Sequence, residues 1–177
     1  GHVTLHAGIA GGADIILLPE IPYDIKAIKK VIDGRSKAGK PFTILAVAEG
    51  AISKKDAKLS KKEYKEKLAK RKYPSIAYEL AEQIQKETDK EVRITVPGHT
   101  QRGGSPCPYD RVFATRVGAK AAELILEEKY GYMVAMKNGE TTKVPLAEVA
   151  GKLKTVDPKC GLIKEARMTG ISFGDEV

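Results

Sequence analysis

The sequence predicts an α/β protein in which a mostly parallel sheet lies between two layers of helices, a three-layer α/β/α arrangement. Apolar runs of four to seven residues alternate with segments of helical period, which is typical of parallel strands covered by helices. The chain has 177 residues, of which 42% are hydrophobic, enough to bury a core of useful size. Asn138-Gly139, which favours a tight hairpin turn, indicates a separate antiparallel pair in the tail.

Each predicted element has a local signal. Pro19 closes the first apolar strand, and Asp24 and Ser75 can cap the helices that follow them. The clearest strand runs from Phe42 to Ala48 and ends at Glu49. In chain order we expect a helix over 3–13, a strand over 15–18, a helix over 25–33, a strand over 42–48, a helix over 76–87, a strand over 93–96, a helix over 109–128, and an antiparallel pair over 133–137 and 143–146.

Positive charge is concentrated in one segment. The chain has 31 Lys and Arg against 23 Asp and Glu, a net charge of +8, and residues 54–72 hold ten basic and three acidic residues, a balance of +7. We interpret residues 52–73 as an exposed helical insertion whose charges are solvated. The alternative is an arm that binds RNA or DNA by displacing counterions from phosphates. We do not favour it, because no nucleic-acid-binding motif accompanies the segment.

Several functional classes lack the residues that they need. Cys107 and Cys160 are isolated, which predicts neither a disulfide scaffold nor a zinc site. His2 and His6 have ligand spacing but no third ligand, so we expect no metal site there. No apolar run reaches the roughly 18 to 20 residues that span a bilayer, and no signal-peptide pattern opens the chain, which favours the cytoplasm. No residue pattern predicts a catalytic base.

Gly34 to Lys40 fits G-x-x-x-x-G-K, the pattern of a nucleotide-binding loop. Position 41 is Pro where a magnesium-binding Ser or Thr is required, and the segment runs from a helix into a strand. No helix N-terminus would therefore face a phosphate. We interpret the segment as the end of a helix, with Lys40 left as a point charge that could meet a phosphate.

The loop from Pro97 to Pro108 carries the strongest functional signal. It lies between a predicted strand and a long helix, which places it at the carboxyl edge of an α/β sheet, where ligands bind. His99 and Arg102 can donate to an anionic oxygen, and Gly103-Gly104 lets the backbone approach one closely. The loop predicts a phosphate or carboxylate site. Glu49, the first charge after an apolar strand, can accept hydrogen bonds from sugar hydroxyls or cap a local turn.

Three elements, in this order and spacing, resemble the C-terminal half of the 6-phosphofructokinase family, the ATP- or pyrophosphate-dependent glycolytic type. They are Ala10-Gly11-Gly12-Ala13-Asp14 with Pro19-Glu20, then Ala48-Glu49-Gly50, then Gly98-His99-Thr100-Gln101-Arg102-Gly103-Gly104-Ser105-Pro106 with Tyr109-Asp110-Arg111. The last element is long and specific to the family. The resemblance runs from Gly1 to about Leu126, and the tail over 144–176 is similar to longer members.

The resemblance implies transfer of a phosphoryl group from ATP or pyrophosphate to the 1-hydroxyl of fructose 6-phosphate, with Mg²⁺, in a homodimer or homotetramer. His99 and Arg102 would hold the sugar 6-phosphate, and Glu49 would accept hydrogen bonds from the sugar hydroxyls. Arg93 would reach the phosphate in a neighbouring protomer. These residues would position the acceptor. Phosphoryl transfer depends on the protein mainly for positioning and for charge compensation.

The same resemblance implies what these residues do not supply. The donor loop, the catalytic aspartate and the magnesium ligands would lie upstream, so we expect a fragment that contributes no catalytic or metal-binding residue and is inactive alone. We expect a Rossmann-like sugar-phosphate domain over 1–108, a segment over 109–150 that returns to a mostly absent donor domain, and a tail over 151–177. Asp14 and Lys40 fit the family's effector site, but Pro41-Phe42 does not, which argues against allosteric control.

Overall fold

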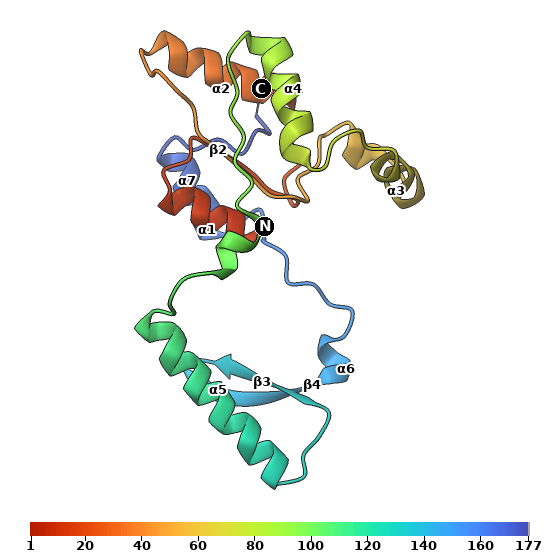
Figure 1. Ribbon diagram of the computed structural model, residues 1–177, viewed down its shortest axis with the longest axis vertical. Coiled ribbons are helices and arrows are strands. Elements are labelled where there is room, and N and C mark those ends of the chain that lie inside the picture. Colours follow the sequence, from red (N-terminus) through yellow and green to blue (C-terminus); the bar gives the residue numbers. More distant parts are fainter. Residues whose placement is uncertain (177) are drawn as a thin grey trace. The chain divides into compact units, whose positions relative to one another are not determined.

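The computed structural model describes residues 1–176, which form two compact units (Figure 1). Unit 1 comprises Gly1–Val96 together with the chain from Thr155 onward, and unit 2 comprises Pro97–Lys154. The chain therefore leaves unit 1 once, forms unit 2, and returns. The domain limits expected from the sequence, 1–108, 109–150 and 151–177, remain a prediction.

Unit 1 is built on parallel backbone pairing. Strand β1 (Ile15–Leu17) pairs in parallel with β2 (Leu45–Val47), with Ile15 opposite Leu45. On its other side Ile15 forms a parallel bridge with Ser172, whose carbonyl accepts a hydrogen bond from the Ile16 amide at 2.8 Å. The mixed α/β class with parallel strands is confirmed, although the sheet is smaller than the sequence predicts.

Alternation along β1 divides the core of unit 1 into two clusters. Ile16 packs with Leu5 of α1 (His2–Ala10), with Ile163 of α7 (Gly161–Met168) and with Phe173, which follows α7. Ile15 and Leu17 pack with α2 (Ile25–Lys37) and α4 (Ile76–Thr88), through Ile28, Leu80 and Ile84. Successive strand residues point to opposite faces, so β1 contributes to both clusters.

Two predicted strands need correction. The apolar run over 42–48 pairs only over Leu45–Val47, and Phe42 and Ile44 are exposed. The Ile44 amide donates to the Asp14 carboxylate at 2.8 Å, so a side chain ends the ladder there. Residues 93–96 form no strand, because within residues 1–176 no neighbouring strand pairs with them. A strand needs a hydrogen-bonded neighbour, and the residue pattern did not reveal that this one was missing.

Helix ends follow the predicted caps in part. Asp24 caps α2 by accepting a hydrogen bond from the Lys26 amide at 2.9 Å. Helix α2 continues to Lys37, so Gly34 lies inside it and the turn falls at Gly39, with φ +74°. Ser75 precedes α4 as expected, but its buried hydroxyl makes no capping bond within the described residues. The backbone of Ser75 therefore marks the helix start without the predicted side-chain bond.

The basic insertion contains a short 3₁₀ helix, η1 (Asp56–Lys58), and α3 (Lys61–Ala69). Ser60 and Glu63 form a capping box: the Glu63 amide donates to the Ser60 hydroxyl, and the Ser60 amide donates to the Glu63 carboxylate at 2.8 Å. No residue of α3 is buried. The predicted exposed helix is confirmed, whereas the limits of the insertion, 52–73, stay a prediction.

Unit 2 contains η2 (Gly98–Arg102), α5 (Pro108–Leu126), β3 (Tyr132–Lys137), β4 (Glu140–Pro145) and α6 (Leu146–Val149). Strands β3 and β4 pair antiparallel, with Lys137 opposite Glu140. Asn138 and Gly139 both have positive φ, 51° and 81°, as a two-residue turn of the predicted kind requires. The hairpin is confirmed, with bounds shifted by up to three residues.

Candidate functional site

The carboxyl ends of the parallel strands in unit 1 bring acidic residues to one edge. Glu20 follows β1 by three residues, and Glu49 follows β2 by two. Asp175 follows the Ser172 bridge. Because parallel strands end at the same edge, this is where an open α/β sheet binds ligands. A Cβ built on Gly50 would lie 3.2 Å from the Pro19 ring, so glycine allows the two connections to pass closely.

Glu20 has a structural partner at this edge. Its Oε1 atom accepts a hydrogen bond from the Val156 amide at 2.9 Å, which attaches the returning tail to the end of β1. Burial is the largest single influence and disfavours the carboxylate, but backbone hydrogen bonds from Val156 and Glu20 itself, together with nearby positive charge, hold the pKa of Glu20 below its usual value. Glu20 therefore serves the fold and is engaged in the absence of any ligand.

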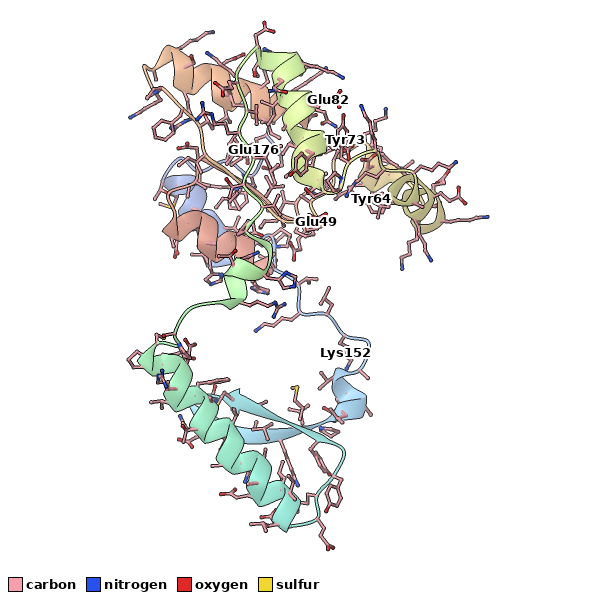
Figure 2. All side chains as sticks on the ribbon, in the orientation of Figure 1. Glu49, Tyr64, Tyr73, Glu82, Lys152 and Glu176 are labelled. Atoms are coloured by element: carbon pink, nitrogen blue, oxygen red, sulfur yellow. The ribbon has the colours of Figure 1, made fainter. Side chains whose placement is uncertain are left out.

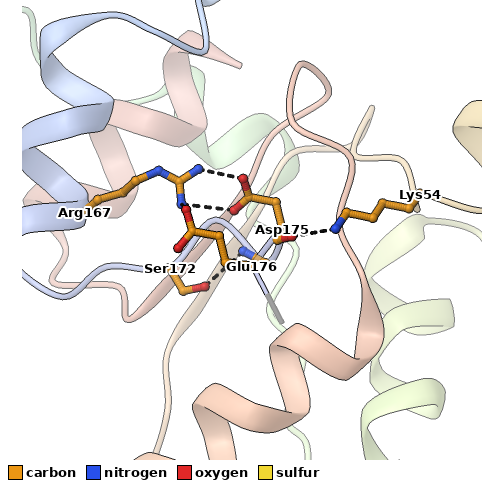
Figure 3. A network of polar contacts seen from close by, with 6 residues as sticks. Lys54, Arg167, Ser172, Asp175 and Glu176 are labelled. Carbon is orange, nitrogen blue, oxygen red and sulfur yellow. Dashed lines mark hydrogen bonds and ion pairs between the residues drawn. The ribbon is translucent and has the colours of Figure 1, made fainter.

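The returning tail is also joined to the insertion (Figure 3). Arg167 donates to both carboxylate oxygens of Asp175, at 3.0 and 2.7 Å, and to Glu176 at 3.1 Å. Lys54 donates to the Asp175 backbone carbonyl at 2.5 Å. The tail of unit 1 and the first lysine of the insertion thus share one polar network.

Glu49 is placed differently from Glu20. Its side chain is 69% exposed, and its Oε1 atom lies 3.7 Å from Nη1 of Arg71, in the insertion. Arg71 is 18% exposed and also contacts Glu79 of α4, with Nε 3.4 Å from Oε2. Glu49 is therefore an accessible carboxylate with one cationic partner among residues 1–176. This is suitable for accepting hydrogen bonds from a polar ligand.

The expected effector residues lie at the opposite edge of the strands. Asp14 precedes β1 and pairs with Arg35, whose Nη1 atom lies 2.8 Å from its Oδ1 atom. Lys40 is exposed, and its amide donates to the Arg35 carbonyl at 3.0 Å. Arg35 thus brings Asp14 and Lys40 to the same region, but the Asp14 carboxylate already holds Arg35 and the Ile44 amide. An effector role for this pair stays a prediction.

His99 and Arg102 both belong to η2, in unit 2. A 3₁₀ helix has three residues per turn, so side chains at positions i and i+3 lie on the same face. Gly98, with φ +52°, begins the turn, and the Gly103 amide closes it on the Thr100 carbonyl at 3.1 Å. Within residues 1–176 neither the His99 nor the Arg102 side chain makes a hydrogen bond or an ion pair. The turn therefore presents two nitrogen-bearing side chains together, both exposed.

Arg93 lies in the extended segment after α4, in unit 1. It is 87% exposed, and its Nε atom is 2.9 Å from Oε1 of Glu91. An exposed pair two residues apart is weak and leaves the guanidinium free to exchange partners. Glu49 and Arg93 thus belong to one unit, and His99 and Arg102 to the other.

Comparison with known proteins gives a family. A family model described as Phosphofructokinase matches residues 1–125. The chain belongs to the phosphofructokinase family. The matched span includes every site residue that the sequence predicts, from Asp14 to Arg102.

Named relatives agree with this family. The chain is 51% identical over 177 residues to an ATP-dependent 6-phosphofructokinase of Spirochaeta thermophila, covering all of this chain and 48% of the relative. It is 44% identical to ATP-dependent 6-phosphofructokinase 3 of Bacteroides thetaiotaomicron, covering 98% of this chain and 47% of the relative. The chain spans about half the length of these curated relatives.

Solved structures extend the comparison to the fold. A phosphofructokinase of Pichia pastoris in the T-state matches with a TM-score of 0.61 and 30% identity, over 84% of this chain and 16% of that one. A pyrophosphate-dependent phosphofructokinase of Marinobacter aquaeolei has a TM-score of 0.69 at 18% identity, over 96% and 44%. The second likeness shows the fold alone. The nucleic-acid alternative for the insertion finds no support in these comparisons.

Sequence reasoning missed Arg71. It treated residues 54–72 as one solvated run, whereas Arg71 is largely buried and contacts the predicted site residue Glu49. One signal was available: Arg71 is the single arginine among the ten basic residues of that run. Arginine is preferred over lysine where a side chain holds carboxylates through several nitrogens. The presence of one arginine in a run of lysines therefore indicated a specific contact.

Within residues 1–176 no group of three His, Cys, Asp or Glu side chains is placed to hold a metal ion. In the same range no helix is both long and apolar enough to cross a membrane.

Proposed function

We propose that this chain is the acceptor-binding half of a 6-phosphofructokinase, the enzyme that moves a phosphoryl group to the 1-hydroxyl of fructose 6-phosphate. The observation that carries the proposal is the Gly98–Pro106 loop, in which η2 sets His99 and Arg102 on one face, with no hydrogen-bond or ion-pair partner for either side chain within residues 1–176. The family match and relatives named ATP-dependent support it and favour ATP over pyrophosphate as the donor.

The residues of this chain would bind and orient the sugar phosphate. Arg102 and His99 would hold the 6-phosphate through charge-assisted hydrogen bonds, and Glu49 would accept hydrogen bonds from sugar hydroxyls. In the reaction a bond forms between the sugar 1-oxygen and the terminal phosphorus of the donor, and the bond from that phosphorus to the donor's bridging oxygen breaks. The hydroxyl proton would pass to a base outside this chain. Positioning the acceptor is the contribution proposed for these residues.

The family resemblance adds further parts to the proposal. Arg93 would reach the 6-phosphate of a neighbouring protomer in a homodimer or homotetramer in the cytoplasm. Its exposure is compatible with an intersubunit contact. Mg²⁺ would assist the donor phosphates, but the described residues offer no cluster that fits the ion, so we derive no step through it. The three-layer sugar-phosphate domain and the segment returning to a donor domain belong to this proposal as well.

Calorimetry with the protein expressed from its full coding sequence tests the proposal. We expect Arg102→Ala to weaken binding of fructose 6-phosphate by about 2 to 4 kcal/mol, because the phosphate loses a charged partner. Lys137→Ala, which removes an exposed charge at the end of β3, is the matched control and should bind like the wild type. Equal affinity of wild type and Arg102→Ala would remove Arg102 from the site. Absence of binding by the wild type would refute the proposed function.

A further inference from the structure

Glu49 lies at the end of a chain of alternating charges that begins in the insertion. Lys67 contacts Asp56 at 2.6 Å and Glu79 at 4.0 Å. Arg71 contacts Glu79 at 3.4 Å and Glu49 at 3.7 Å. The order is therefore Asp56, Lys67, Glu79, Arg71, Glu49, with each cation between two carboxylates. Such a network resists the loss of one contact better than an isolated surface pair.

The insertion that supplies this network is fixed at both ends. At its start the Tyr23 amide donates to the Ile52 carbonyl at 3.0 Å, and the Lys54 amide donates to the Tyr23 carbonyl at 2.7 Å. At its end the Tyr73 hydroxyl hydrogen-bonds to Glu82 of α4; both side chains are labelled in Figure 2. An exposed segment anchored in this way can hold an inward side chain in one place. That condition is needed for Arg71 to act on Glu49 in a defined geometry.

Three side chains of the network are largely buried, with exposed fractions of 15% for Asp56, 18% for Arg71 and 21% for Glu79. Tyr23 is 2% exposed and belongs to the cluster with Ile15 and Leu17. Its pKa is raised to about 12, chiefly by burial and then by the negative charges of Glu79 and Asp56. Arg71 and Lys67 consequently compensate negative charge at a partly desolvated surface.

The chemistry of arginine explains why this position differs from the lysines around it. The guanidinium contacts Glu79 through Nε and Glu49 through Nη1, two different nitrogens of one rigid plane. A lysine ammonium is a single point charge on a flexible stem and fixes the direction of neither carboxylate as well. Within residues 1–176 Lys70, the preceding residue, takes part in no ion pair. Position 71 thus has a contact that position 70 does not share.

We propose that Arg71 is a positioning residue for Glu49, through which the insertion 52–73 orders the sugar-binding carboxylate before substrate arrives. This inference rests on the proposed function of Glu49 as an acceptor of hydrogen bonds from the sugar. A carboxylate already held in place loses less rotamer freedom on binding. This effect acts on substrate binding more than on the chemical step.

Steady-state kinetics of the protein expressed from its full coding sequence tests this role. We expect Arg71→Gln to raise the KM for fructose 6-phosphate by about 3- to 10-fold, with kcat changed by less than about 2-fold, since a partly exposed pair contributes on the order of one decade. Arg71→Lys should give a smaller rise. Lys70→Gln is the matched control and should leave both constants unchanged.

A double substitution separates positioning from a general structural role. If Arg71 acts through Glu49, Arg71→Gln should add almost nothing to the KM of Glu49→Gln, because the carboxylate that it orders is already gone. Additive effects would overturn the proposal. If Arg71→Gln does not fold, Arg71→Lys can replace it in the comparison with Glu49→Gln. A KM for Arg71→Lys equal to that of the wild type would show that Glu49 does not need the two-nitrogen contact of a guanidinium, and would overturn the proposal.

The same assay distinguishes this inference from the proposed function. If Glu49→Gln raises KM and Arg71→Gln does not, the positioning role is wrong and the acceptor site stands. If Glu49→Gln leaves KM unchanged, Glu49 is not a sugar contact and the inference falls with it. If the wild-type protein phosphorylates no fructose 6-phosphate, the proposed function itself fails.

Discussion

Arg167 holds Asp175 through two hydrogen bonds, from Nη1 at 3.0 Å and from Nη2 at 2.7 Å (Figure 3). The same guanidinium lies 4.9 Å from the ring centre of Phe173, a fully buried residue. These contacts fix the last residues of the described chain against α7. Since the Ser172 bridge extends the parallel pairing of β1, the Arg167 contacts support the core and not only the surface.

Arg167→Ala is therefore expected to lower the free energy of unfolding by about 2 kcal/mol, because Asp175 loses a two-point charged partner and Phe173 loses its cover. Lys164→Ala, in the same helix, is the control and should change stability by less than about 0.5 kcal/mol. Urea unfolding followed by circular dichroism measures both. Equal values for the two variants would show that the two-point contact contributes nothing.

Tyr23 predicts an alkaline limit to stability. Burial and nearby carboxylates raise its pKa from 10.0 to about 12, so the folded state holds the phenolic proton more tightly than the unfolded state. The contribution of this pKa difference to the free energy of unfolding is fully present below about pH 10 and is lost as the pH rises towards about 12. Tyr23→Phe should flatten the fall of stability in that window. Tyr78→Phe, at a more exposed tyrosine, should leave the fall unchanged, and identical profiles for all three proteins would contradict this assignment.

Two glycines should respond to alanine with opposite signs. Gly174 has φ +71°, and a Cβ there would lie 2.7 Å from Leu17 in the core. Gly174→Ala should therefore destabilise the protein by about 2 to 4 kcal/mol through backbone strain and overpacking. Gly34 lies inside α2 with open space around it, so Gly34→Ala should stabilise by about 0.5 to 1 kcal/mol. Thermal unfolding tests both, and a change of the same sign in both variants would be inconsistent with this structure.

Arg93 gives a prediction about assembly. If it reaches the phosphate of a neighbouring protomer, Arg93→Ala should raise the KM for fructose 6-phosphate by about tenfold without lowering the melting temperature, since within residues 1–176 its side chain makes no ion pair other than the exposed one with Glu91. Glu91→Gln removes that local partner and should not raise KM. Mixing Arg93→Ala protein with Arg102→Ala protein should restore some activity if sites form from two protomers. No recovery in mixed oligomers would place Arg93 outside the site.

Local signals in the chain correctly predicted many elements. Asp24 caps α2, Asn138-Gly139 turns the hairpin, and the apolar run at Ile15 becomes the central parallel strand. These outcomes depend on residues within a few positions of one another, where intrinsic preferences act. The composition of the Gly98–Pro106 loop also indicates an anion site, and that site stays a prediction.

Long-range packing decided the rest. The segment 93–96 has strand composition but no neighbouring strand in the described chain. The Asp14 carboxylate, expected to bind an effector, instead pairs with Arg35 and accepts a hydrogen bond from the Ile44 amide. Arg71 meets Glu49 only because both ends of the insertion are attached to unit 1. The sequence by itself determined the order of elements and the chemical groups available. The tertiary structure decided which charges meet, because ion-pair partners are selected by distances in space that no local pattern encodes.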